Sequence, residues 1–290
     1  MHAFPHRCFA LILTLVLLAT GCATQGGQER VALIIGNSAY SHATSLKNPS
    51  NDAAAMADAF RRLGFSVVQG QNLTHEGMER QVYDFLQRLD HTEVAVFFYA
   101  GHGLQLAGKN FLVPVDFDPE RDEYLTAQLI QLDWVLDKMP KGAKHNLIFL
   151  DACRDNPFTT ALASKLANGR SVPIDATRGM QVVGKGGLAE AYKVVGKGLA
   201  EAKGSLGTLI AYATPPGNVA SDGSGANSPF TTGLLRHLEE PGLEIRQVLT
   251  KVRMGVVSET GGQQIPWDNS SLTDNFYLKK KPFTIVPPVF

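Results

Sequence analysis

Four apolar runs in the chain lack the polar and apolar alternation of a strand with one exposed face. They cover residues 31–35, 94–99, 147–150 and 207–214. Runs of this length without alternation are typical of strands covered on both faces, as in a parallel sheet packed between helix layers. A shorter segment, 65–68, predicts one further strand.

Segments between these runs carry apolar residues at the three- and four-residue spacing of amphipathic helices. Turn and cap residues mark where the helices begin, and we expect these starts at Asn48, Thr74, Pro229 and near Trp134 and Ile245. Strands that alternate with helices predict an α/β fold, in which a mostly parallel central sheet with right-handed crossovers has helices on both faces. Residues 111–115 are expected in a loop, and 263–278 in a largely extended tail.

Residues 154–204 interrupt this order because their apolar periodicity fades. Within them, 182–191 is nearly repeated by 194–202, and two copies are too few for a repeat architecture. We interpret 154–204 as a surface insertion within one domain, 31–278, and loop statistics predict that it is mobile or functional rather than packed. Its basic residues are either incidental charges of a solvated linker or sites of self-cleavage. Residues 23–30 are then a linker and 279–290 a tail.

The first 22 residues have the pattern of an export signal. Their apolar stretch, 9–19, is shorter than the roughly 20 residues of a permanent membrane-spanning helix. Residues 18–22 resemble the bacterial lipoprotein signal, although Ala19 stands where that family usually carries Leu or Val. The resemblance implies that Cys22 is acylated, so that a lipid anchor alone holds the exported protein at the periplasmic face of a bacterial membrane. A soluble periplasmic product and a plain buried N-terminal helix are the alternatives.

Charge and cysteine content narrow the function classes. Basic and acidic residues both total 27, so no net charge directs the chain toward nucleic acid. Of the three cysteines, Cys8 lies in the signal and Cys22 at its end. Cys153 is therefore expected to be a lone thiol in an export compartment, where paired thiols oxidise. Such a cysteine is either buried and inert or reactive.

Two of the apolar runs end in residues suited to thiol chemistry. The run 94–99 leads into Ala-Gly-His-Gly and the run 147–150 into Asp-Ala-Cys-Arg, so His102 and Cys153, 51 positions apart, follow two strand ends. Ligands and chemistry collect at the carboxyl ends of parallel strands, and adjacent strands lie about 4.8 Å apart. We predict that Cys153 is the nucleophile, that His102 is its base and then acid, and that the backbone N–H groups of Gly103 and Cys153 bind the oxyanion. A structural loop histidine is the alternative for His102.

Both strand ends resemble the motifs of the caspase-like cysteine proteases, which include caspases, metacaspases and bacterial relatives. Tyr-Ala-Gly-His-Gly at 99–103 is similar to the histidine motif of the family, and Asp-Ala-Cys-Arg at 151–154 to its cysteine motif. The resemblance runs from residue 31 to about 238. It implies a three-layer caspase-like fold and a cysteine endopeptidase with a Cys-His dyad and without a metal or organic cofactor.

The chain departs from animal caspases at positions that concern the substrate. Animal caspases carry Gln before the Ala-Cys pair and an arginine in the loop after the first strand, which suit an aspartate side chain. This chain has Asp151 and Asp52 at those positions, and both resemble the acidic pocket residues of metacaspases, which accept Arg or Lys. Carboxylates that line a pocket favour a cation and reject an anion. Asp222 is a candidate third carboxylate, and for Asp52 the alternative is a helix N-terminal carboxylate.

An acidic cluster raises the question of calcium, which metacaspases often need. It consists of Asp116, Asp118, Asp122 and Glu123. Its spacing matches no known calcium loop. We therefore interpret it as a solvated acidic turn and predict no metal site.

Two hypotheses for the function follow. The first is an exported cysteine endopeptidase that cleaves protein or peptide substrates after Arg or Lys. The second is a non-catalytic peptide-binding or scaffold protein on the caspase fold, because no feature of the sequence demonstrates turnover.

Overall fold

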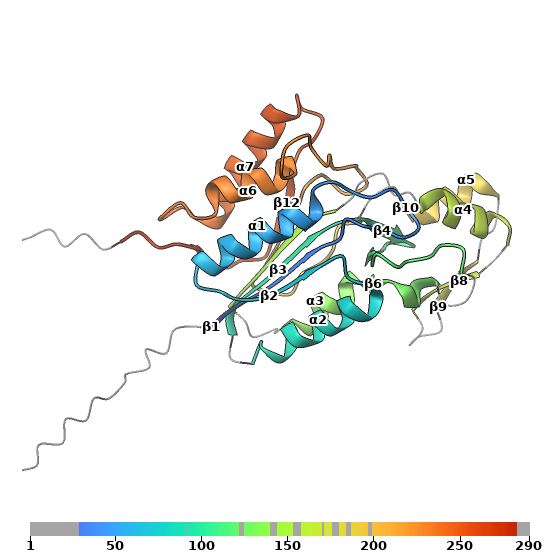
Figure 1. The fold of residues 1–290 in the computed structure, drawn as a ribbon, viewed down its shortest axis with the longest axis horizontal. Coiled ribbons are helices and arrows are strands. Elements are labelled where there is room, and N and C mark those ends of the chain that lie inside the picture. Colours follow the sequence, from blue (N-terminus) through green and yellow to red (C-terminus); the bar gives the residue numbers. More distant parts are fainter. Residues whose placement is uncertain are drawn as a thin grey trace, which may run out of the picture.

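A six-stranded sheet forms the centre of the molecule (Figure 1). The computed structural model describes residues 29–90, 92–121, 125–139, 144–152, 158–169, 171–175, 180–183, 187–196 and 199–282. The strand order is β12-β11-β7-β3-β1-β2, with bounds β1 Glu29–Gly36, β2 Ser66–Gln71, β3 Thr92–Ala100, β7 His145–Asp151, β11 Thr208–Tyr212 and β12 Trp267–Ser270. All neighbouring pairs are parallel except β11 and β12, which are antiparallel.

Helices cover both faces of this sheet, as Figure 1 shows. One face carries α1 (Pro49–Arg62), α6 (Pro229–His237) and α7 (Ile245–Glu259), and the other carries α2 (His75–Gln87) and α3 (Leu132–Lys138). Alternate side chains of each strand point to opposite faces and fill two separate cores; in β7, Leu147 and Phe149 enter the first and Ile148 and Leu150 the second. The predicted α/β class, with a mostly parallel sheet between two helix layers, is confirmed.

The strands that precede the two candidate catalytic residues are neighbours in the sheet. β3 pairs with β7 in parallel, and in this register Ala100 lies opposite Asp151. His102 follows Ala100 by two positions, and Cys153 follows Asp151 by the same number. The register therefore brings the two motifs to the same edge of the sheet.

A smaller sheet lies beyond that edge. It contains β4 (Gly103–Leu106), β5 (Lys109–Leu112), β6 (Ile130–Gln131) and β10 (Val195–Gly196), in the order β10-β4-β5-β6. A 3-10 helix, Leu125–Gln128, precedes β6. Phe111 and Leu112 therefore belong to a strand, and the prediction of a loop at 111–115 is wrong for them. The hairpin arises because Gly108, with φ +78, closes a tight turn between two strands of four residues.

Some described parts of 154–204 are packed, so the prediction of an unpacked insertion is wrong for these parts. The helices and strands described in this segment are α4 (Thr159–Ala167), β8 (Ser171–Asp175), β9 (Met180–Val183), α5 (Leu188–Val194) and β10, which belongs to the smaller sheet. Phe158, Leu162 and Leu166 fill a third core together with residues of the smaller sheet. Helices of nine and seven residues show too little periodicity to be recognised in the sequence.

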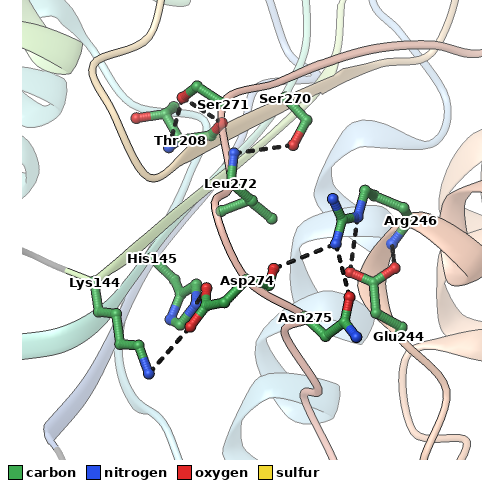
Figure 2. Close-up of polar contacts among 10 residues, drawn as sticks. All are labelled: Lys144, His145, Thr208, Glu244, Arg246, Ser270, Ser271, Leu272, Asp274 and Asn275. Atoms are coloured by element: carbon green, nitrogen blue, oxygen red, sulfur yellow. Dashed lines mark hydrogen bonds and ion pairs between the residues drawn. The ribbon is translucent and has the colours of Figure 1, made fainter.

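The C-terminal tail crosses the opposite end of the main sheet, where β7 begins. Figure 2 shows Asp274 beside the side chains of Lys144 and His145. One carboxylate oxygen lies 2.9 Å from the His145 ring and the other 3.2 Å from the Lys144 ammonium. Phe276 is buried and packs against the same ring, with the two ring planes tilted by 41°. The tail is thus fixed to the start of β7.

The predicted export signal and Cys22 lie outside the described residues. None of the helices within the described ranges is long and apolar enough to cross a membrane.

Candidate active site

The ends of β3 and β7 touch each other beyond the last paired residues. The Gly101 N–H donates to the Asp151 carbonyl at 3.3 Å. A Cβ built on Gly103 would lie 3.4 Å from the Cβ of Ala152. The histidine motif is therefore in contact with the two residues that precede Cys153. Cys153 itself, the predicted nucleophile and oxyanion donor, lies outside the described residues.

His102 is enclosed by aromatic side chains from two other segments. Its exposure is 3%. Its ring centroid lies 4.5 Å from that of Tyr40 and 6.0 Å from that of Phe158. Its backbone N–H donates to the Tyr40 hydroxyl at 2.7 Å, and its carbonyl accepts from the Tyr99 hydroxyl at 2.8 Å. The main chain at His102 is thus held on both sides.

Glycine is required on both sides of His102, because neighbouring side chains leave no room for a Cβ atom there. Gly101 has φ +153, and a Cβ there would lie 2.7 Å from the hydroxyl oxygens of both Tyr40 and Tyr99. A Cβ on Gly103 would come within 2.9 Å of the Leu199 side chain. The Gly-His-Gly motif therefore allows neighbouring segments to approach the histidine closely.

The two carboxylates predicted to read the substrate meet at one serine. Asp52, in the first turn of α1, and Asp151, at the end of β7, are both fully buried. The Ser228 N–H donates to Asp52 at 3.0 Å, and the Ser228 hydroxyl donates to Asp151. Asn227 adds a bond to Asp52 at 2.9 Å, and Thr231 one to Asp151 at 2.9 Å. The structure thus brings Asp52 and Asp151 together at the N-terminus of α6.

The electrostatics of this arrangement favour negative charge. Ser228 is the N-cap of α6 and accepts the Thr231 N–H at 3.0 Å. A helix N-terminus carries a partial positive charge and free N–H groups, which stabilise carboxylates placed beside it. The same contacts give both aspartates a structural use, since they connect α1 and β7 to the loop before α6.

Asp222 contacts the residues that precede α1. Its carboxylate accepts the N–H groups of Lys47 at 2.6 Å and Asn48 at 3.3 Å, while the Asn48 side chain donates to the Asp222 carbonyl. Asn48 is the N-cap residue of α1, but its side chain makes no capping bond to the helix. Asp222 therefore joins its loop to the start of the helix that carries Asp52.

Asp222 also lines a cavity of about 760 Å³, whose wall includes Glu259. The two buried aspartates are not among the described residues that line it. The three predicted carboxylates therefore border one region of the molecule without sharing this cavity.

The acidic cluster does not assemble into a cation site in the part of the chain that the structure describes. Asp116 accepts the His75 N–H at 2.8 Å, at the start of α2, and Asp118 accepts the N–H of Glu120 at 2.9 Å. Within the described ranges, no group of three or more His, Cys, Asp or Glu is placed to hold a metal ion. Asp122 and Glu123 lie outside those ranges.

Two contributors to the site were not found by sequence reasoning, Tyr40 and Ser228. Ser228 does carry a local signal, because a serine followed by proline at the first helical position is a common N-cap pattern. Tyr40 carries none, since it is an isolated aromatic residue 62 positions from the histidine that it contacts.

Comparison with known proteins gives consistent results. The model of the caspase domain family matches residues 29–277. The human "Mucosa-associated lymphoid tissue lymphoma translocation protein 1" is 34% identical over 128 residues, which cover 44% of this chain and 15% of that protein. Mouse caspase-12 is 31% identical over 80 residues, or 27% of this chain and 19% of that protein. The chain thus spans less than a fifth of the length of these curated relatives.

A solved structure extends the likeness to the whole fold. The crystal structure of caspase-1 from Spodoptera frugiperda superposes with a TM-score of 0.57 at 19% identity, covering 89% of this chain and 93% of that one. At this identity the likeness supports the fold alone.

Proposed function

Since the chain belongs to the caspase domain family, we propose that it is a cysteine endopeptidase that cleaves after Arg or Lys. Cys153 attacks the scissile carbonyl carbon while His102 accepts the thiol proton. The N–H groups of Gly103 and Cys153 stabilise the oxyanion, and His102 returns the proton to the leaving amine. Water, deprotonated by His102, then hydrolyses the thioester and restores the thiol.

One observation carries this proposal: the two motif-bearing strands are adjacent and their ends are joined by the Gly101 to Asp151 hydrogen bond. Asp151 and Ala152, the two residues that precede Cys153, contact the histidine motif, and this contact supports the proposed pairing of Cys153 with His102.

Specificity for a basic residue is supported by the paired carboxylates. Asp151 is two residues before the proposed nucleophile in the sequence. Ser228 is hydrogen-bonded to both Asp151 and Asp52. A guanidinium or ammonium group gains strongly from buried carboxylates, whereas an aspartate side chain would be repelled. Asp222 is proposed as a third acidic neighbour on the loop that leads into α6.

The test uses reporter peptides with Arg, Lys or Asp before the cleavage site. We expect cleavage of the Arg and Lys peptides by the purified full-length chain and none by Cys153→Ala. Asp151→Asn should reduce cleavage of the basic peptides. Asp58→Asn serves as a control, because it neutralises an exposed carboxylate of α1 that does not line the cavity at Asp222. Activity that survives Cys153→Ala would exclude the nucleophile, and a preference for Asp would exclude the acidic pocket.

A second candidate, a non-catalytic peptide-binding or scaffold protein, is favoured by the enclosure of His102, which is only 3% exposed. Thiol alkylation distinguishes the two functions. A scaffold should show slow alkylation of Cys153, with a pH midpoint near that of a free cysteine, about 8.5. Faster alkylation at lower pH would support a thiolate paired with an imidazolium.

We also propose that the protein acts outside the cytoplasm. Acylation of Cys22 would hold it at the periplasmic face by a lipid anchor, so its partners would be exported proteins or peptides with basic residues. Metabolic labelling with a fatty acid tests this, since label should enter the wild-type chain and be absent from Cys22→Ala. Self-cleavage within 154–204 predicts two fragments from the active protein and none from Cys153→Ala.

A further inference from the structure

Two neighbouring tyrosine hydroxyls enclose the main chain of His102. The His102 N–H donates to the Tyr40 hydroxyl oxygen at 2.7 Å. The Tyr99 hydroxyl donates to the His102 carbonyl at 2.8 Å and also lies 3.0 Å from the Val113 carbonyl. Both phenolic oxygens lie 2.7 Å from the position of a Cβ on Gly101, so the two hydroxyls are neighbours. One pair of phenols therefore holds both polar main-chain groups of His102.

Both tyrosines are buried, and Tyr99 remains protonated. Tyr40 is 6% exposed and Tyr99 is fully buried. Burial raises the pKa of Tyr99 well above its usual value, and the neighbouring Tyr40 raises it further. The Tyr99 hydroxyl is thus a donor throughout the neutral range. Hydrogen bonds inside a protein are stronger than in water.

The two hydroxyls explain why a glycine precedes His102. The position of a Cβ on Gly101 lies 2.7 Å from each of the two phenolic oxygens. Any side chain there would clash with both hydroxyl oxygens. The first glycine of the motif and the two tyrosines are therefore one structural unit.

Tyr40 also touches the imidazole itself. The two ring centroids are 4.5 Å apart, with the ring planes tilted by 50°. Tyr40 lies in the segment between β1 and α1, and the next residue, Ser41, is fixed by its N–H bond to the Val115 carbonyl at 2.8 Å. A residue anchored on a different segment thus limits both the main-chain position and the ring orientation of His102.

We propose that Tyr40 is a positioning residue for His102, holding the imidazole where it can exchange a proton with the Cys153 thiol. The inference rests on the proposed peptidase function. A general base acts only within hydrogen-bond reach of its proton, and a displacement of about 1 Å from the productive geometry can cost about 100-fold in rate. Substrate binding uses the carboxylates instead, so Tyr40 should affect turnover and leave binding unchanged.

The experiment compares three variants of the full-length chain. Tyr40→Phe removes the hydroxyl and keeps the ring, and Tyr40→Leu removes both. Tyr212→Phe is the matched control, because Tyr212 is also buried and its hydroxyl also accepts a backbone N–H, that of Ala202 at 2.8 Å. Thermal unfolding verifies that each variant folds, and kcat and KM are measured with the Arg reporter peptide.

We expect Tyr40→Phe to lower kcat about tenfold with KM unchanged, Tyr40→Leu to lower it about 100-fold, and Tyr212→Phe to have no effect on kcat. An equal loss in Tyr212→Phe would show a general effect of destabilisation and overturn the proposal. A rise in KM at constant kcat in the Tyr40 variants would also overturn it.

A second readout does not depend on activity. In protein with labelled histidine, the resonances of the His102 amide and ring are identified by their loss in His102→Ala. Tyr40→Phe should shift the amide and ring signals, and Tyr212→Phe should not. If the wild-type protein cleaves no peptide, the peptidase proposal fails, and the positioning role is judged from these signals. Unchanged His102 signals in Tyr40→Phe would overturn the role whatever the activity.

Discussion

Replacing Ser228 with alanine should destabilise the protein more than the loss of an ordinary helix cap. The Ser228 hydroxyl makes two contacts: it accepts the Thr231 N–H as the N-cap of α6, and it donates to the buried carboxylate of Asp151. Loss of an N-cap costs about 1 kcal/mol. Loss of a hydrogen bond to a charged group costs about 2 kcal/mol more. The expected decrease in the free energy of unfolding is therefore about 3 kcal/mol.

The assay is equilibrium unfolding in urea, with Thr74→Ala as the matched control. Thr74 is the N-cap of α2 and accepts the Gly77 N–H at 3.2 Å, but it is exposed and holds no carboxylate. Its loss should cost about 1 kcal/mol. The difference of about 2 kcal/mol then measures the bond to Asp151. If both variants lose the same free energy, the reasoning about the buried carboxylate is wrong.

Two further predictions concern other parts of the fold. Gly101→Ala should destabilise the protein by about 3 kcal/mol, because it combines an unfavourable φ with a steric clash. Gly108→Ala, which has positive φ but open space, should cost about 1 kcal/mol in the same urea unfolding assay. Equal losses would exclude the clash. For Asp274, the hydrogen bond from His145, followed by that from Lys144, lowers the pKa of the carboxyl group in the folded state. Its contribution to stability is therefore present above the unfolded pKa, about 3.9, and disappears as the pH falls through the lower folded value. Asp274→Asn should flatten the acid limb of stability measured by urea unfolding between about pH 5 and 2, and an unchanged slope would contradict this origin of the shift.

The main strands and the two motifs could be predicted because their signals are local. A run such as 147–150 must be apolar at every position when both of its faces are covered, so it is readable without knowledge of the partners. The adjacency of β3 and β7 was also predictable, because the proposed pairing of Cys153 with His102 implies that the two motifs meet at one edge of the sheet. The contacts of Tyr40 and Ser228 were not predictable, because their partners are distant in the sequence. Tyr40 is 62 positions from His102, and Ser228 is at least 77 positions from the two aspartates.

Residues 188–191 and 199–202 show the limit of local sequence most directly. Both segments read Leu-Ala-Glu-Ala, yet the first lies in α5 and the second is not helical. In the second copy, Asn110 bonds both the N–H and the carbonyl of Ala200, and Leu199 is buried against the main sheet. The Asn110 side chain, which belongs to the smaller sheet, thus takes the two main-chain hydrogen bonds of Ala200 that a helix would otherwise use.

The sequence by itself determined the alternation of strands and helices, the two motif-bearing strand ends and the acidic residue before the cysteine, since each is encoded in residues close together along the chain. Tertiary structure alone decided which conformation the repeated segment takes, how the aspartates share Ser228, and how two tyrosines enclose His102. These features arise from contacts between distant segments, whose free energy exceeds the weak preferences of any short stretch of chain.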